Sequence, residues 1–391
     1  MLSIVREFHA VGQGAFYSEK HYGFNIVYDC GNWRNSRSST TIVENAFRKG
    51  DEIDVLFISH FDYDHVNKIN VLARNFNIKR VVMPLIHEQE LNLLVNFYRV
   101  MKCNILTLLL DPERFFGEGT DIIRVSPALE QDYFDFEDRE RNFIEIDKLS
   151  ERTLASGTVL VKKFDFYEWI FIPFNHENKS RCLELESELY KLGLSGSDIY
   201  SLKHDPDYTI NKIVSDVGKS KKNGGKKFKE AYDNVTGGIN SNSMLVFSGL
   251  RDDSNIKVTN YIHYDLSSPS KFERNYIFKS RAYCEHEICS AKVSCVYTGD
   301  CDLNLVKPKN VFSDFWSTVG TIQVPHHGAL NNFCWDVLDA NHYYFPLSVG
   351  LNNTYSHPSR LVINNIALTG SSPVLITENP SSKLTQTHWV K

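Results

Sequence analysis

Apolar residues follow two patterns along the chain. Val55–Ile58 and Lys79–Leu85 are dominated by consecutive apolar and β-branched residues, which is typical of buried strands. Glu88–Met101 instead spaces its apolar residues as one face of a helix does, and so do Arg181–Leu194 and Ser359–Ala367. Because strands and helices of these kinds alternate, the pattern predicts an α/β fold.

Both ends of the chain follow this alternation more regularly than the middle does. Near the start, Ile4–His9 and Phe24–Asp29 are expected to be strands, and glycines mark the turn between them. Further helices are expected at Thr41–Lys49, Asp64–Asn75 and Ala329–Asn341. The irregular stretch 104–235 indicates an insertion that forms a cap beside a core of residues 1–103 and 236–391.

Four candidate metal ligands follow the strand at Val55–Ile58. His60, Asp62, Asp64 and His65 lie within six positions. The strand period of two turns the first three to one side, and His65 follows on the turn into the next helix. Open α/β sheets place their sites at the carboxyl ends of strands. Imidazole and carboxylate groups at this density predict a catalytic transition-metal site.

Three later strands are followed by side chains of the same kind. Asp300 follows one apolar run, the pair His326 and His327 follows another, and His357 lies in the loop after a third. If the carboxyl ends of these strands meet in one crevice, carboxylates and imidazoles from the whole chain gather there. Two metal ions about 3.5–4 Å apart and bridged by a carboxylate need such a set of ligands.

The composition of the chain indicates which kind of protein carries this site. Hydrophobic residues make up 42% and charged residues 23%, as in a well-packed globular chain. No apolar run is long enough to span a membrane, and the N-terminus alternates like a strand, so we expect neither an anchor nor a signal peptide. The eight scattered cysteines favour reduced thiols in a cytoplasm.

The net charge of −5 argues against a general nucleic-acid binder, so any contact with a polyanion has to be local. The basic, glycine-rich stretch Lys219–Lys229 is one candidate for such a contact. A solvated loop is the plainer interpretation of this stretch.

Seven short motifs carry a resemblance to a known family. They are Val11-Gly-Gln-Gly14, Tyr28-Asp-Cys-Gly31, Ile58-Ser-His-Phe-Asp-Tyr-Asp-His65, Asn240-Ser-Asn-Ser243, Thr298-Gly-Asp300, Val324-Pro-His-His-Gly328, and Ser348-Val-Gly-Leu-Asn352 with Tyr355-Ser-His-Pro358. In this order they resemble the metallo-β-lactamase superfamily of metal-dependent hydrolases. The branch they resemble most is the nuclease-like domain of ComEC-type DNA-uptake proteins. The resemblance implies a four-layer αββα sandwich of two mixed β-sheets with a large insertion.

The resemblance also implies a role for each matching position. His60 and Asp62 would hold one metal ion, and Asp64 and His65 would hold the other. Asp300 would bridge the two ions.

Further positions would complete this site. His357 would complete the shell of the second metal ion, and His326 is a candidate for the first. His327 would face the substrate, where it would orient a phosphate or protonate a leaving group. Asn242 and Asn352 would contact substrate oxygens.

Two departures from the superfamily pattern remove imidazole from the site. The commonest pattern has His at the position of Asp62, and it has a mid-chain His where this sequence offers only Asn242. Oxygen donors favour harder cations, so the two divalent ions are expected to be Zn²⁺ or Mn²⁺. Asp29 is expected to support the glycine turn and not to be a ligand.

The implied chemistry is hydrolysis by a metal-bridging hydroxide, with Asp64 and Asp300 able to take the proton of the attacking water. The function favoured is a dinuclear phosphodiesterase or nuclease acting on nucleic acid. A hydrolase of small molecules, such as a cyclic nucleotide, a phosphocholine ester, a lactam or a thioester, stays open because a fold does not choose its substrate. A non-enzymatic subunit with a structural metal site, binding a protein partner through residues 104–235, stays open as well.

Overall fold

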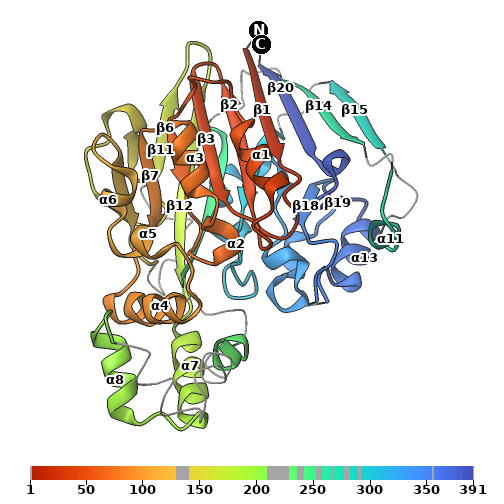
Figure 1. The fold of residues 1–391 in the computed structure, drawn as a ribbon. Helices are drawn as coiled ribbons and strands as arrows, with labels where there is room; N and C mark the ends of the chain where they lie inside the picture. The colour runs from red at the N-terminus through yellow and green to blue at the C-terminus, as the bar shows by residue number, and fades with distance from the viewer. Residues whose placement is uncertain are drawn as a thin grey trace.

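The computed structural model describes residues 2–128, 141–208, 229–235, 242–251, 258–265, 268–276, 282–288, 292–354 and 356–390. Within these ranges, no helix combines the length and the apolar character needed to cross a membrane. The two ends of the chain lie side by side, because β1 (Leu2–Phe8) pairs antiparallel with β20 (Leu384–Val390) (Figure 1).

The first large sheet has the strand order β10-β8-β7-β5-β3-β2-β1-β20-β14-β15 among the described residues. Its other strands are β2 (Phe16–His21), β3 (Phe24–Cys30), β5 (Val55–Phe57), β7 (Arg80–Pro84), β8 (Asp121–Val125), β10 (Thr153–Leu154), β14 (Val258–Asp265) and β15 (Ala282–Ile288). Neighbours from β3 to β10 are parallel, and the remaining neighbours are antiparallel. The carboxyl ends of β3, β5 and β7 therefore share one edge of a mixed sheet. A separate short pair joins β4 (Glu52–Ile53) to β6 (Asn77–Ile78).

The second large sheet has the order β19-β18-β17-β16-β13-β12-β11-β9 in the described ranges. Its strands are β9 (Phe143–Glu145), β11 (Val159–Lys163), β12 (Glu168–Glu177), β13 (Asn242–Leu250), β16 (Ser294–Tyr297), β17 (Val319–Ile322), β18 (Tyr344–Ser348) and β19 (Ser372–Ile376). Strands β16 to β19 are parallel neighbours, so the loops that follow β16, β17 and β18 leave the sheet at one edge.

Helices cover the outer faces of both sheets. On the first sheet they are α1 (Arg37–Glu44), α2 (Tyr63–Val66), α3 (Ile69–Asn75), α4 (Glu88–Val100), α5 (Leu106–Leu110) and α6 (Pro112–Phe116). Elsewhere they are α11 (Lys271–Arg274), α12 (Pro308–Val311) and α13 (Arg360–Leu368), with 3₁₀ turns η3 (Ile146–Lys148), η4 (Ser313–Thr318), η5 (His326–Gly328), η6 (Leu330–Asn332), η7 (Trp335–Val337) and η8 (Pro380–Ser382).

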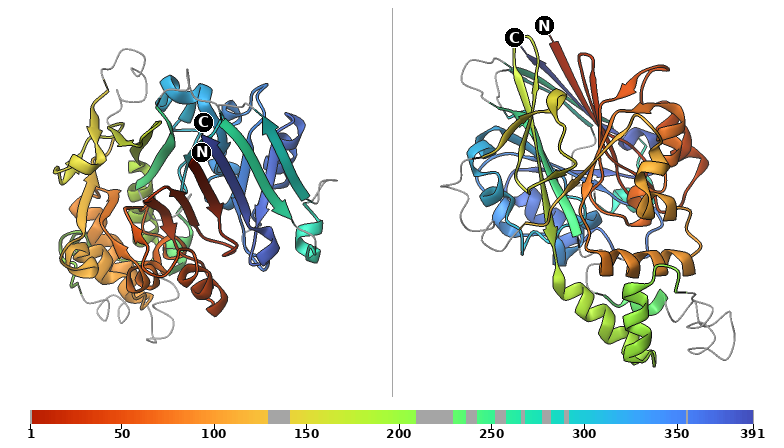
Figure 2. Two further views of the ribbon diagram at one scale, coloured as in Figure 1. Left: turned by 90° about the horizontal axis from the view of Figure 1, so that it is seen from above. Right: turned by 90° about the vertical axis from the view of Figure 1, so that its left-hand side faces the viewer.

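The alternation within single strands explains the layers. In β5 and just after it, Val55 and Phe57 belong to the apolar cluster between the two sheets, whereas Leu56 and Ile58 belong to the cluster beneath the helices. A third apolar cluster joins the second sheet to α12 and α13. These three interfaces separate four layers, seen edge-on in Figure 2, and confirm the predicted α/β fold with two mixed sheets.

The predicted helix at Ala329–Asn341 is wrong. The structure has the two 3₁₀ turns η6 and η7 there. Asn332 explains the difference, because its amide binds the Asp300 carbonyl oxygen at 3.2 Å and His326 Nδ1 at 3.0 Å. Such side-chain bonds compete with helix formation and tie this segment to the strand ends.

The predicted helix at Asp64–Asn75 is two helices, α2 and α3, separated at Asn67 and Lys68. The side-chain Nδ2 of Asn67 donates to the Asn32 carbonyl oxygen at 2.6 Å, and the Oδ1 of Asn67 accepts from the backbone N–H of Asn32 at 3.1 Å. This exchange holds α2 against the turn that follows β3.

The predicted insertion at 104–235 is only partly separate from the sheets. Strands β8 to β12 of this range pair within the two large sheets. Outside the sheets lie α7 (Lys179–Lys191), α8 (Gly196–His204) and residues 229–235, which pack through their own apolar cluster against Leu93 and Phe97 of α4. We call α7, α8 and residues 229–235 the lobe; its helices lie below α4 in Figure 1.

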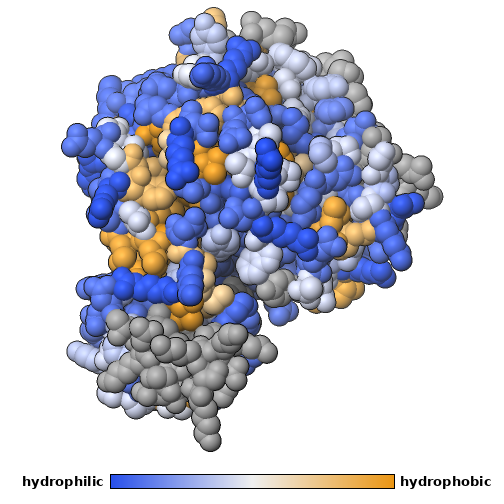
Figure 3. All heavy atoms as spheres, in the orientation of Figure 1, coloured by the Kyte–Doolittle hydropathy of each residue, from blue (hydrophilic) through white to orange (hydrophobic). Residues whose placement is uncertain are grey.

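The surface in the view of Figure 1 is mainly hydrophilic. Hydrophobic side chains gather on its left flank over α5 and α6, above the lobe (Figure 3). Leu110, at the end of α5, is 42% exposed there.

Candidate metal centre

The loop after β5 is held in place by two glycine turns. Asp64 and His65 of this loop lie in α2. Gly14 and Gly31 pack so closely on α2 that a Cβ at either position would overlap the Asp64 carbonyl oxygen. Gly14 also has a φ of 132°, which favours glycine. The glycines of the first two motifs therefore fix the direction in which Asp64 and His65 point.

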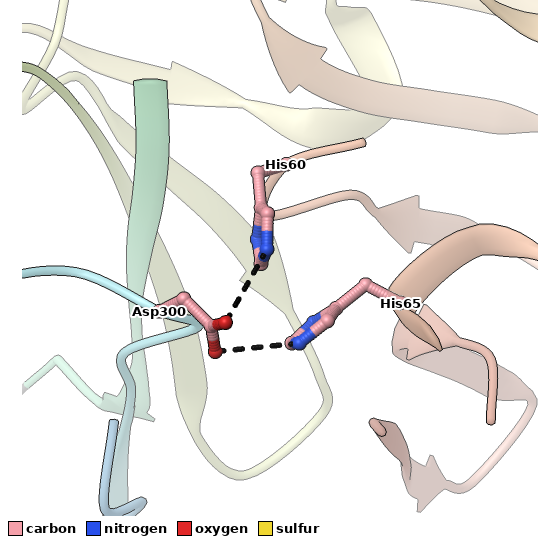
Figure 4. Close-up of side chains that lie close together, drawn as sticks. All are labelled: His60, His65 and Asp300. Atoms are coloured by element: carbon pink, nitrogen blue, oxygen red, sulfur yellow. Dashed lines mark ion pairs between the residues drawn. The ribbon is translucent and has the colours of Figure 1, made fainter. Parts of the chain in front are cut away.

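Three buried side chains meet at the centre of the site: His60, His65 and Asp300 (Figure 4). Asp300 follows β16 and faces both rings. Its Oδ2 lies 3.7 Å from His60 Nε2, and its Oδ1 lies 3.3 Å from His65 Nε2. The three donor atoms lie within 4.8 Å of one another, so a single cation can contact all of them.

A second group of donors shares one residue with the first. It contains Asp64, His65 and His327, whose donor atoms also lie within 4.8 Å of one another. His327 Nε2 lies 3.1 Å from Asp64 Oδ2. Because His65 belongs to both groups, the two candidate positions adjoin.

Asp62, His326 and His357 border these two groups. Asp62 Oδ2 lies 3.4 Å from His60 Nε2, and His326 Nε2 lies 3.9 Å from Asp300 Oδ2. The ring of His357 lies beside that of His326, with 5.3 Å between the ring centroids. All three side chains are partly exposed and line the same cavity. The structure therefore brings every predicted metal ligand, together with His327, to one place.

Asp29 orients two of the histidines from behind. Its Oδ2 accepts hydrogen bonds from His65 Nδ1 at 2.8 Å and from the Ser59 hydroxyl at 2.6 Å. Since the Ser59 hydroxyl gives its hydrogen to Asp29, it accepts from His60 Nδ1, 2.8 Å away. This network assigns the ring protons to Nδ1 and leaves Nε2 of both rings to face Asp300. Sequence reasoning missed Ser59, although it adjoins His60 in the motif.

His327 is fixed by the second sheet. Its Nδ1 donates to the Ser348 carbonyl oxygen, 2.8 Å away at the end of β18, so its Nε2 faces Asp64. The φ angles of His326 and His327 are 45° and 54°, both in the left-handed region. Such backbone strain costs of order 1–3 kcal/mol per residue and is found where a function requires it.

The charges in this site act strongly on one another. Burial disfavours a charged His65, but the carboxylates of Asp300 and Asp29 outweigh burial and raise the pKa of His65 well above its usual value. Burial likewise opposes a charged Asp300, but His65, His326 and His60 lower the pKa of Asp300 well below its usual value. Carboxylates therefore create a field in this buried site that attracts positive charge.

The donor atoms fit a divalent metal ion. Nε2 of His60, Nε2 of His65 and Oδ1 of Asp300 are buried and make no hydrogen bond within the described part of the chain. A buried polar atom without such a bond costs about 1–3 kcal/mol. Imidazole nitrogen and carboxylate oxygen are ligands for both Zn²⁺ and Mn²⁺, so a cation would satisfy these atoms.

The cavity in front of these ligands has a volume of about 660 Å³. Its opposite wall comes from α4 and the lobe and includes Phe97, Met101 and Tyr232. The rings of Phe97 and Tyr232 stack with 4.0 Å between their centroids. The sequence did not predict this wall. Phe97 and Met101 were recognisable only as parts of an amphipathic helix, and Tyr232 belongs to no motif.

Tyr98 ties this wall to the ligand loop. Its hydroxyl lies 2.6 Å from the Phe61 carbonyl oxygen and 3.3 Å from Asp62 Oδ1. A helix of the opposite wall therefore helps to position Asp62.

Neither of the two expected substrate contacts, Asn242 and Asn352, lines the metal-site cavity. Asn242 is buried in β13, and its amide donates to Asn175 Oδ1 at 3.1 Å. Asn352 is exposed and lines a neighbouring cavity. Of the basic stretch Lys219–Lys229, Lys229 lines the metal-site cavity, and the other residues lie outside the described ranges. Asn240, Ser241 and Tyr355 of the sequence motifs also lie outside them.

Part of the chain matches the model of a known protein family. Residues 19–143 match the model of the metallo-beta-lactamase superfamily, a stretch that contains His60 to His65 and ends before Asp300. No curated protein matches the chain. Together with the two donor groups, the match supports a metal-dependent hydrolase with a metallo-β-lactamase domain.

Among solved structures, the chain is similar to the metallo-beta-lactamase fold protein YhfI from Bacillus subtilis. The identity is 11%, the TM-score is 0.19, and the similarity covers 46% of this chain and 55% of that protein. The matched region thus spans about half of the length of that structure.

Proposed function

We propose that the protein is a dinuclear metal-dependent phosphodiesterase that acts on nucleic acid. The observation that carries this proposal is the convergence of two neighbouring donor groups, linked through His65, behind one cavity that Asp64, Asp300 and His327 line. A carboxylate between two sets of ligands is what a two-metal site requires, and Asp300 faces both His60 and His65.

The chain would hold one ion with His60 and Asp62 and the other with Asp64 and His65, with Asp300 facing both sets and His357 close by. When bound, such ions lower the pKa of water and neutralise the charge that builds on a phosphoryl oxygen. The protein's own groups supply the orientation. Asp29 and Ser59 hold the rings of His60 and His65 from behind.

His327 is the group in this site that can hold a proton close to a leaving oxygen. The hydrogen bond from its Nδ1 to the Ser348 carbonyl leaves Nε2 to face the site. Burial lowers the pKa of His327, but the hydrogen bond to Asp64 and the charges of Asp300 and Asp64 raise it above the usual value. A general acid in this position contributes about 10²–10⁴-fold to a rate.

A hydrolase of small molecules is the second candidate. The cavity of about 660 Å³ lies within the range of ~300–1,000 Å³ that encloses small ligands, and the lobe supplies part of its wall. The carboxylates of Asp62, Asp64 and Asp300 and the two lysines that line the cavity, Lys102 and Lys229, favour phosphodiesters over lactams or thioesters. They do not separate a cyclic nucleotide from a polymer.

The test is hydrolysis by purified protein loaded with Mn²⁺ or Zn²⁺. Substrates are single- and double-stranded DNA and RNA, a cyclic nucleotide and bis(p-nitrophenyl) phosphate, with bound metal counted by elemental analysis. We expect metal-dependent cleavage of nucleic acid, lost by about 10³-fold or more in Asp300→Asn.

Asp302→Asn is the matched control, because Asp302 carries the same group two residues farther along and does not line the cavity. It is expected to retain activity. Two bound metal ions without cleavage of any phosphodiester would falsify the proposal, and cleavage of the cyclic nucleotide alone would favour the second candidate.

A further inference from the structure

A second cavity adjoins the one in front of the metal ligands. It has a volume of about 460 Å³ and shares Gln13 and Trp33 with the larger cavity. The two cavities therefore meet along the turn that contains Gln13 and at the side chain of Trp33. A ligand that fills both would pass directly over this boundary.

The two cavities offer different chemistry. The larger one has the metal ligands on one side and Phe97, Met101 and Tyr232 on the other. Tyr232 is buried, whereas Phe97 and Met101 are partly exposed and offer an apolar contact for a base. The smaller one is lined by amides, among them Asn32 and Asn353. Amides can both donate and accept hydrogen bonds, so this second surface suits the polar edges of a ligand.

Trp33 stands where the cavities meet. It lines both of them and is 43% exposed, which is unusual for the largest apolar side chain. An exposed indole between the two cavities is a surface on which a base can stack, whatever the identity of the base.

Cationic side chains lie along both cavities. Arg34 lines the smaller one, where its guanidinium donates to the Asn352 carbonyl oxygen at 3.3 Å. Lys102 and Lys229 line the larger one, and Lys229 is paired with Asp233. Glu378 also lines the smaller cavity, so each cavity offers at least one cationic side chain to a phosphate, among acidic neighbours.

We propose that the two cavities form one binding groove for single-stranded nucleic acid, with the scissile phosphate over the metal ligands of the larger cavity and the neighbouring nucleotide in the smaller cavity, beyond Trp33. This proposal rests on the proposed function and specifies its substrate. Trp33 stacks on a base at the boundary, and Arg34 contacts the backbone beyond it. A duplex is disfavoured because its bases must first unstack and leave their partners before they can stack on protein rings.

Strand preference is the first measurement. The metal-loaded enzyme is given one oligonucleotide, either alone or annealed to its complement, at equal concentration. We expect kcat/KM for the single strand to exceed that for the duplex by at least tenfold. Bis(p-nitrophenyl) phosphate is hydrolysed in parallel, because it reports the metal-dependent reaction without any base.

Substitution of Trp33 is the second measurement. Trp33→Ala should raise KM for the single strand by about tenfold or more, the loss expected for one stacked base. Trp33→Phe should restore most of this loss because a ring remains. Trp335→Ala is the matched control, since Trp335 is also 43% exposed and lines neither cavity; it should leave KM unchanged.

The salt dependence of KM in Arg34→Gln is the third measurement. Because Arg34 is exposed, its substitution does not threaten folding. Loss of one phosphate contact should reduce the slope of log KM against log salt concentration by about 0.7, the value for one contact to a single strand.

The outcomes separate this proposal from the proposed function. If bis(p-nitrophenyl) phosphate and all nucleic acids stay intact, the proposed function fails. If diesters are cleaved but duplex is cut as fast as single strand, or Trp33→Ala behaves like Trp335→Ala, the groove proposal alone is overturned. Cleavage restricted to mononucleotide diesters would also overturn it.

Discussion

The two walls of the metal-site cavity are built in opposite ways. On the ligand wall, each inner side chain emerges from a strand end and is held from behind: His60 and His65 by the Asp29 network, and His327 by the Ser348 carbonyl. The other wall consists of α4 and the lobe. The lobe packs on Leu93 of α4 through a fourth apolar cluster, while Leu94 and Val95 of α4 belong to the cluster beneath the helices of the first sheet. We therefore expect the ligand wall to determine which reaction is catalysed and the helical wall to determine which substrates reach the metal ligands.

The largest effect on stability should come from removing the metal ions that the ligand wall would hold. Removing metal with a chelator is expected to lower the free energy of unfolding by about 4 kcal/mol for each ion, if the ions are present at ~1,000 times their dissociation constants. Thermal unfolding with and without Mn²⁺ or Zn²⁺ measures this. Asp300→Asn should lose most of the metal-dependent shift, and an equal shift in that variant would contradict the assignment of Asp300 as a ligand.

The helical wall can be weakened without touching the ligands. Leu189 is fully buried in the cluster of the lobe, so Leu189→Ala should cost about 2–5 kcal/mol of local stability. Limited proteolysis should cut the lobe of this variant faster, while elemental analysis finds the metal content of the wild type. A variant that loses metal would show that the two walls are one cooperative unit.

The support behind the ligands should matter less than the ligands themselves. Asp29→Asn keeps the size of the side chain but replaces the charged acceptor of the His65 and Ser59 hydrogen bonds. Metal affinity is expected to fall about 10–100-fold, as for other groups that orient a metal-binding histidine. Competition with a coloured chelator measures the affinity. Unchanged affinity would mean that the glycine turns position His65 alone.

The smallest effect should come from the contact that joins the two walls. Tyr98→Phe removes the hydroxyl that bonds the Phe61 carbonyl and Asp62. The loss should be about 1 kcal/mol of stability, with a several-fold lower metal affinity at most. Tyr190→Phe, at a tyrosine of the lobe that is 54% exposed, is the control for loss of a phenol. Equal unfolding curves for the two variants would show that Tyr98 does not couple the walls.

The sequence predicted the ligand wall better than the helical wall, for a physical reason. Ligands are chemically conspicuous and follow apolar strands, so His60 to His65, Asp300 and His326 to His327 could be placed at strand ends from residue type and periodicity. The fold class followed from the same alternation and is confirmed.

Features that depend on long-range packing could not be read in this way. Periodicity predicted a helix at Ala329–Asn341, because nothing in the local sequence shows that the Asn332 side chain hydrogen-bonds to the Asp300 carbonyl oxygen at the strand end. The strands within 121–177 were assigned to an insertion, since irregular spacing hides pairing between distant segments. Trp33 was passed over because a lone tryptophan carries no pattern until its two neighbouring cavities are seen.

The place of β20 has a consequence for the order in which the molecule can assemble. This strand lies between β1 and β14, with a register that runs from Leu2 opposite Val390 to Phe8 opposite Leu384. During translation, β1 and its first neighbour β2 leave the ribosome long before β20, the neighbour on the other side, exists. The first sheet therefore stays split in two until residues 384–390 emerge, and a nascent chain has an open seam that a chaperone, or the edge of another chain, can occupy.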